Sequence, residues 1–184
     1  MRKLIASIFM TLDGFMADTS GDLGWSHSPP EQEQATGDLL DHADTILLGR
    51  VTYEIISAYW PFATDDEFLA AKMNTIPKVV LSKTLQQATW GKWNNATIAP
   101  GEIGAEVMKL KQQPGKDIVI IGSSKIVSAL AQRGLIDDFR LLINPVALGN
   151  GVRLFDDLST PVKLKLLSSL TYPGGVMETH YAPA

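Results

Sequence analysis

Two apolar runs that end in glycine constrain the fold of this chain more than any other feature. The first run spans residues 46–48 and is followed by Gly49, and the second spans residues 118–121 and is followed by Gly122. Uninterrupted β-branched and leucine residues are typical of strands covered on both faces, as in a parallel sheet. Each run passes through its glycine into a helical pattern, so we expect strands and helices to alternate in an α/β domain.

The same patterns extend along most of the chain. Eight strands are expected, at residues 3–9, 45–48, 78–82, 97–99, 117–121, 139–146, 162–169 and 176–181. Helical patterns fall between the early strands, starting near Pro30, Thr52, Asp65-Asp66, Ile103 and Ser124. The last strands follow one another without helices, which suits antiparallel pairing. We therefore expect a single domain over residues 1–184, an α/β fold of three layers with a mixed, mostly parallel central sheet of about eight strands flanked by helices.

Composition and missing motifs argue against several classes of function. The net charge of −4 gives no general attraction for nucleic acid or an anionic membrane, so neither is an expected partner. The chain has no cysteine, and its three histidines are scattered, so no metal site is expected. The apolar run near the N-terminus is short and lacks a cleavage site, which favours a first core strand over a signal peptide. With no segment long enough to span a bilayer, the expected location is the cytoplasm.

The helix starts after the two glycines carry an unusual set of side chains. Hydroxyl and cationic groups gather there: Arg50, Thr52, Ser123, Ser124 and Lys125. A cation in a first helical turn opposes the helix dipole, but an anion held by the free N–H groups and the side chain would account for it. Structural roles stay open, with Arg50 as a solvated charge and a serine as a simple N-cap. Taken together, the two starts predict a ligand with more than one phosphate.

A third strand end adds to this pattern. The strand expected at residues 78–82 ends in Ser82 and is followed by Lys83. If the strands are parallel neighbours, Ser82 and Lys83 emerge at the same sheet edge as Arg50 and Ser123, where ligands of open α/β sheets bind. Three such ends could hold a diphosphate and one further phosphate, which is the charge layout of NADPH.

The order of these motifs resembles the dihydrofolate-reductase-like superfamily. In particular, the chain is similar to the reductase domain of the bifunctional riboflavin-biosynthesis deaminase/reductase and its stand-alone bacterial relatives. The matching segments are residues 11–14, 47–54, 59–61, 78–82, 121–123, 134–141 and 145–151, followed by Leu154-Phe155. The resemblance implies a dihydrofolate-reductase-like fold, NADPH as cofactor, a homodimer, and a small heterocyclic molecule as substrate.

The resemblance also implies roles for individual residues. It assigns to the cofactor Gly49, Arg50, Thr52, Ser82, Gly122, Ser123 and Ser124, and the adjoining Leu48 and Lys83 complete the expected cofactor site. In such proteins the first turn contacts the cofactor phosphates, the hydroxyl of Ser82 lies by the adenosine 2′-phosphate, and the second turn receives the diphosphate. Dihydrofolate reductases have two consecutive glycines at the second turn. Here the second of them is Ser123, so their glycine–glycine peptide geometry is not assumed.

On the substrate side, Asp13 is the catalytic candidate. Its carboxylate follows the first strand and could bind a heterocycle or relay a proton. An aspartate before Gly14 can equally serve the turn alone. Trp25, Tyr53 and Trp60 could line a cavity for a flat ring, with core packing as the alternative for each.

The leading functional hypothesis is NADPH-dependent hydride transfer to a ribosylaminopyrimidine of riboflavin biosynthesis, which would open its ribose to a ribityl chain. The phosphate of that substrate would need a cationic pocket, for which Lys72, Arg140 and Arg153 are candidates. One alternative is reduction of dihydrofolate, another pterin or a small carbonyl compound. The other is a dimeric module that binds NADPH without chemistry.

Overall fold

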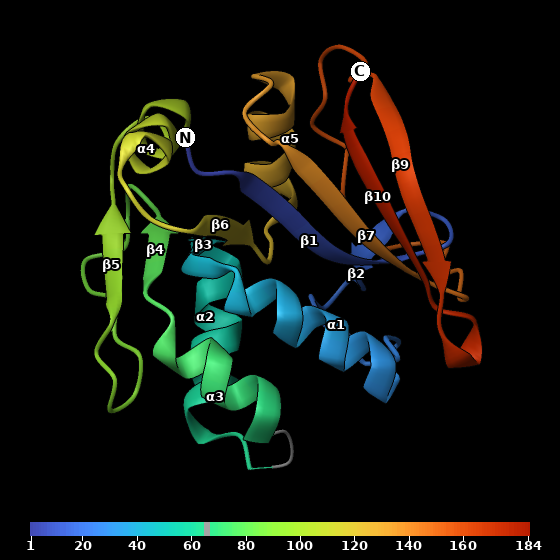
Figure 1. Ribbon diagram of the computed structural model, residues 1–184, viewed down its shortest axis with the longest axis horizontal. Helices are drawn as coiled ribbons and strands as arrows, with labels where there is room; N and C mark the ends of the chain where they lie inside the picture. The colour runs from blue at the N-terminus through green and yellow to red at the C-terminus, as the bar shows by residue number, and fades with distance from the viewer. Residues whose placement is uncertain (65–66) are drawn as a thin grey trace.

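The apolar runs of the sequence form the middle of an eight-stranded sheet, in the order β5-β4-β3-β6-β1-β7-β10-β9 (Figure 1). The computed structural model describes residues 1–64 and 67–184. The strands of this sheet are β1 (Leu4–Thr11), β3 (Ala43–Gly49), β4 (Lys78–Leu81), β5 (Ala96–Ala99), β6 (Asp117–Ile120), β7 (Asp138–Asn144), β9 (Leu164–Thr171) and β10 (Met177–Pro183). All pairs from β5 to β7 are parallel, and β10 is antiparallel to both β7 and β9. The expected mixed, mostly parallel sheet is therefore confirmed.

Five α-helices flank the sheet in the described ranges: α1 (Pro30–Asp41), α2 (Arg50–Tyr59), α3 (Glu67–Thr75), α4 (Ile103–Gln112) and α5 (Ser124–Gln132). In Figure 1, α1, α2 and α3 lie on one side of the strands and α4 and α5 on the other. The expected start of the third helix, Asp65-Asp66, lies outside the described residues. Within those residues, no helix has the length and apolar character needed to cross a membrane.

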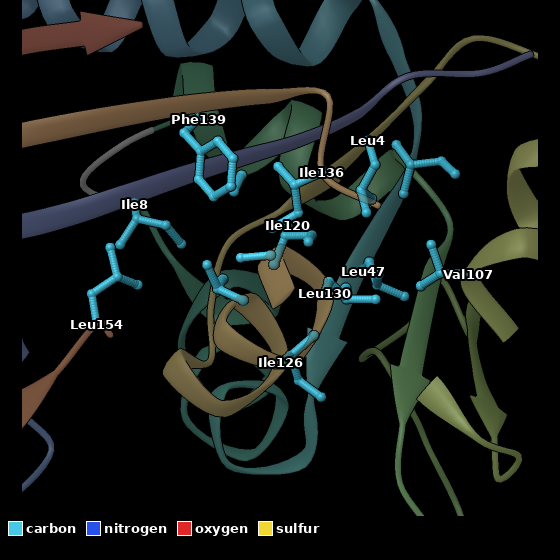
Figure 2. Packing of buried hydrophobic residues seen from close by; sticks show 14 of the residues in the cluster. Leu4, Ile8, Leu47, Val107, Ile120, Ile126, Leu130, Ile136, Phe139 and Leu154 are labelled. Carbon is cyan, nitrogen blue, oxygen red and sulfur yellow. The ribbon is translucent and has the colours of Figure 1, made fainter. Parts of the chain in front are cut away.

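The alternation of side chains along β3 divides the core into two halves. Leu47 is buried in the larger cluster with residues of α4 and α5, whereas Ile46 and Leu48 are buried in a cluster with residues of α1, α2 and α3. Figure 2 shows the larger half, in which Leu130 and Ile126 of α5 lie against the strands. A strand buried on both faces needs an uninterrupted apolar run, which explains the pattern seen in the sequence.

The smaller half of the core contains one buried cation. Lys78, at the start of β4, has no exposed surface. Its Nζ donates a hydrogen bond to the backbone oxygen of Asn74 at 3.0 Å and lies 4.1 Å from the ring centroid of buried Trp90. The carbonyl oxygen and the aromatic face both favour the ammonium and partly replace the water that it has lost.

The register brings three strand ends to one edge of the sheet. Gly49 is paired with Leu81 of β4, and Leu47 is paired with Ile120 of β6. The residues that follow β4, β3 and β6 therefore leave the sheet side by side, because parallel strands in register end at the same edge. The expectation that these strands are parallel neighbours is confirmed.

Two short strands, and the exact position of one further strand, were not expected from the sequence. β2 (Phe15–Ala17) and β8 (Val152–Arg153) form an antiparallel ribbon between two stretches that read as loops. Strands of two or three residues are too short to show a period-2 pattern. The strand expected at 162–169 is β9, two residues further along, and most of its residues are exposed.

Candidate functional site

The two glycine turns lie against each other at the sheet edge. A Cβ atom on Gly49 would lie 2.5 Å from the Ser123 Oγ, and one on Gly122 would lie 3.0 Å from the Thr52 Oγ1. Gly49 has an ordinary extended backbone with φ of −80°, so glycine is needed there because a side chain would not fit and not because of its backbone angles. Gly122 has a φ of +118°, which glycine adopts most readily. The starts of α2 and α5 are thus two sides of one site.

Neither helix start is capped by a side chain. Gly49 is the N-cap of α2, Ser123 is the N-cap of α5, and neither forms a side-chain capping hydrogen bond. The interpretation of Ser123 as a conventional serine cap is therefore not supported. The Gly122–Ser123 peptide bond is cis. Uncapped N–H groups at two adjacent helix starts form a suitable site for an anion with two charged groups.

Arg50 lies at the start of α2 with its guanidinium on the surface. Its Nη1 donates to the Glu54 Oε1 at 2.9 Å and to the Oε2 at 3.1 Å, and both side chains are nearly half exposed. An exposed i,i+4 pair contributes only about 0.3–0.5 kcal/mol. A phosphate at the helix start could therefore draw the guanidinium away from Glu54 at small cost.

The residues that follow β4, Ser82 and Lys83, form the third part of the site. The Ser82 Oγ accepts hydrogen bonds from the backbone N–H groups of Thr84 and Leu85, at 3.2 and 3.0 Å, and Lys83 is exposed beside it. This turn leaves the hydroxyl hydrogen of Ser82 available to a ligand. The side chain of Leu48 is buried in the core, so only its backbone can contribute to binding.

An apolar cavity of about 160 Å³ adjoins both helix starts. Residues of α2, β1, β2 and the loop that follows β2 form its walls, among them Val51, Ile55, Ile56, Ile8, Phe9, Met16 and Leu23. The polar side chains among its described lining residues belong to Ser7, Thr52, Ser123 and Ser124. A cavity of this size accommodates roughly one six-membered ring.

The side chain of Asp13 links the turn after β1 to the loop between β7 and β8 by hydrogen bonds. Its carboxylate accepts hydrogen bonds from the Thr11 hydroxyl at 2.6 Å, from the Gly149 N–H at 2.7 Å and from the Leu148 N–H at 3.2 Å. These bonds, with that of Thr11 the strongest, hold the pKa of Asp13 below its usual value. Asp13 does not line the apolar cavity. The geometry therefore favours the turn interpretation, and a proton relay by Asp13 stays a prediction.

The three aromatic candidates do not line the apolar cavity. Tyr53 is buried, and its hydroxyl donates to the Thr89 oxygen at 2.9 Å, while Trp60 packs on the same core cluster. Tyr53 lies on the face of α2 opposite to Val51 and Ile55, which explains why it turns inward. The Trp25 Nε1 is buried and has no hydrogen-bond partner among the described residues.

Sequence reasoning found the cavity hydroxyls of Thr52, Ser123 and Ser124 but missed the apolar residues that form most of its walls. Val51 and Ile55 occupy an exposed face of α2, while Leu23 follows β2 and Val152 lies in β8, far away in the chain. A helix of a soluble domain is usually polar on its outer face. The apolar residues at positions i and i+4 of α2 were the available signal, because they leave this helix apolar on two sides.

Comparisons with known proteins agree on the fold and the family. The family model of the RibD C-terminal domain matches residues 2–177. The uncharacterized protein YyaP of Bacillus subtilis (strain 168) is 33% identical over 98% of this chain and 94% of its own length. A Shewanella sp. PV-4 structure named for riboflavin biosynthesis is 24% identical, with a TM-score of 0.82 and 99% of each chain covered.

More distant structures extend the comparison. The Thermotoga maritima deaminase and 5-amino-6-(5-phosphoribosylamino)uracil reductase is 15% identical, with a TM-score of 0.73 over all of this chain and 57% of that one. Dihydrofolate reductase from Enterococcus faecalis, solved with NADP(H), is also 15% identical, with a TM-score of 0.66 over 98% of this chain and 96% of that one. These likenesses show a dihydrofolate-reductase-like fold, and together with the family match they establish that the chain belongs to the RibD C-terminal domain family.

Proposed function

We propose that the protein is a reductase that takes its hydride from NADPH and passes it to a small heterocyclic acceptor. One observation carries the proposal: the two uncapped helix starts meet at Gly49 and Ser123, directly beside an apolar cavity of about one ring. A site for a diphosphate next to an apolar, ring-sized cavity suits a nicotinamide dinucleotide. Membership of a reductase family supports the same reading.

The residues present fit the phosphorylated form of this cofactor. The N–H groups of both helix starts and the side chains of Arg50 and Lys125 would hold the diphosphate. Ser82 and Lys83, at the neighbouring strand end, would hold the 2′-phosphate that distinguishes NADPH from NADH. Bound NADPH supplies the hydride. The walls of the cavity would orient the nicotinamide ring and exclude water from it.

The acceptor is the open part of the proposal. The Thermotoga maritima reductase is named for 5-amino-6-(5-phosphoribosylamino)uracil, which makes this ribosylaminopyrimidine the first compound to assay. Dihydrofolate is the second, because a dihydrofolate reductase shares the fold. Loss of the nicotinamide absorbance at 340 nm measures turnover of either compound.

Cofactor binding is tested by replacing Arg50. A charge-assisted contact is worth about 1.5–3 kcal/mol, so Arg50→Ala should weaken NADPH binding about 10- to 100-fold in a fluorescence titration. Glu54→Ala is the matched control, since it removes the ion pair of Arg50 but leaves the guanidinium free, and it should keep or raise the affinity. Equal NADPH affinities for Arg50→Ala and the wild type would refute this placement of the phosphates.

A further inference from the structure

One polar residue interrupts the apolar run of the central strand β1. The sequence of this strand is LIASIFMT, in which Ser7 stands between apolar residues on both sides. β1 lies between β6 and β7, and its residues Ile5 and Ile8 are buried in core clusters on opposite faces of the sheet. A strand covered in this way favours an apolar residue at each position, and alanine would fit where serine fits. Departures from such a pattern are expected at functional sites.

No contact within the described part of the protein accounts for the hydroxyl of Ser7. Across residues 1–64 and 67–184 its oxygen takes part in no hydrogen bond. Its neighbour in the register on β7 is Arg140, but the guanidinium of Arg140 pairs with Asp138 at 3.1 Å. Ser7 is partly exposed and lines the apolar cavity. Its hydroxyl is therefore available to a ligand that enters this cavity.

The position of Ser7 differs from that of the other hydroxyls of the cavity. Three of them lie at the starts of α2 and α5, where the diphosphate is proposed to bind: Thr52, Ser123 and Ser124. Ser7 belongs to the sheet instead. Because Ala6 is paired with Ile120 of β6, Ser7 is level with Ile121, just before the second glycine turn. A nicotinamide ring that extends from the helix starts into the cavity therefore meets the hydroxyl of Ser7 on the sheet.

We propose that the hydroxyl of Ser7 binds the carboxamide of the nicotinamide ring and sets the orientation of the ring. This inference rests on the proposed function. The carboxamide is the polar substituent of the ring: its oxygen accepts hydrogen bonds and its NH₂ group donates them, and a hydroxyl can pair with either. With the diphosphate at the helix starts and the carboxamide at Ser7, the ring is held at two points. It then cannot turn over about its bond to the ribose, and C4 presents the same hydrogen to the acceptor.

The first experiment separates this role from a structural one and needs no ligand. Ser7→Ala removes a hydroxyl from a central strand in which an apolar residue is favoured. The melting temperature of the full chain without cofactor should therefore stay unchanged or rise. If the hydroxyl supported the fold instead, its loss would lower the melting temperature, and a decrease of more than about 3 °C would overturn the inference.

The second experiment compares NADPH with 2′-phospho-ADP-ribose, which has the same phosphates but no nicotinamide. Both affinities are measured by isothermal titration calorimetry. Ser7→Ala should weaken NADPH binding about 2- to 10-fold, as expected for the loss of one hydrogen bond, and leave the affinity for 2′-phospho-ADP-ribose unchanged. Ser124→Ala is the matched control, because it removes the same group at a helix start, and it should change both affinities by the same factor.

The possible results distinguish the inference from the proposed function. Unchanged NADPH affinity of Ser7→Ala would overturn the inference. Equal losses for the two ligands would also overturn it, because they would place Ser7 at the phosphates. In both cases the binding of NADPH by the wild type would leave the proposed function standing. Absence of NADPH binding by the wild type would instead refute the proposed function.

Discussion

The buried ammonium of Lys78 should make the stability of the protein depend on pH. Burial lowers the pKa of Lys78 from 10.5 to about 7, because the ammonium loses its contact with water. Between about pH 7 and pH 10.5, Lys78 carries a proton in the unfolded chain but not in the folded protein. The free energy of unfolding therefore rises with pH across this window, and the contribution is lost as the pH falls through about 7.

The size of this effect follows from the pKa difference. Each pH unit inside the window is worth about 1.4 kcal/mol, so the gain between pH 6 and pH 9 is about 2–3 kcal/mol. The Asn74 oxygen and the Trp90 ring stabilise the ammonium, which favours the lower end of this range. Lys78→Met keeps most of the volume of the side chain and removes the titrating group. The variant should therefore be most favoured over the wild type at low pH.

Urea unfolding of both proteins at pH 6, 7.5 and 9 tests this reasoning. The difference in unfolding free energy between the variant and the wild type should shift by about 2 kcal/mol in favour of the wild type from pH 6 to pH 9. Lys83→Met, at an exposed lysine, is the control and should show a constant difference. A difference for Lys78→Met that stays constant within about 0.5 kcal/mol would mean that Lys78 titrates alike in both states.

Two further predictions concern the helix starts and the edge of the sheet. Gly49→Ala should destabilise the protein by about 1–3 kcal/mol and weaken NADPH binding, because its Cβ would lie 2.5 Å from the Ser123 Oγ. The double variant with Ser123→Gly should recover stability in thermal unfolding, and failure to recover would count against this contact. The homodimer expected from the resemblance should involve edge strand β9, where Leu167 is 58% exposed. Leu167→Glu should then give a monomer by light scattering, while Phe62→Glu at another exposed site should leave the mass unchanged, and a wild-type monomer would contradict the expectation.

Much of the fold follows from local patterns. The five helices and the eight strands of the main sheet were expected because their apolar runs and turn residues are strong signals. The meeting of the three strand ends was also predictable, since parallel strands share an edge. The ribbon of β2 and β8 was not, because such short strands depend on partners that lie far away in the chain.

The candidate site also has parts that could be predicted from the sequence and parts that could not. Arg50 and Ser82 could be found because each directly follows a strand that ends at the site. The cavity could not be found, since Leu23, Ile55 and Val152 are unremarkable singly and become a site only when tertiary structure gathers them. Tyr53 belongs to the core although it follows the first glycine turn closely, because a large aromatic residue near a motif is equally suited to core packing.

The ribbon of β2 and β8 has a consequence for selectivity. Its two strands carry Met16 and Val152 of the cavity, and the hydrogen bond from the Gly149 N–H to Asp13 links the preceding segments a second time. Because β2 and β8 are hydrogen-bonded to each other, we expect these two walls of the cavity to move together. The cavity entrance should then change little in shape when a ligand binds. We therefore expect the size of the entrance to decide which ligands bind, and substitutions at Leu23 or Val152 to change that selection more than substitutions that loosen the loops.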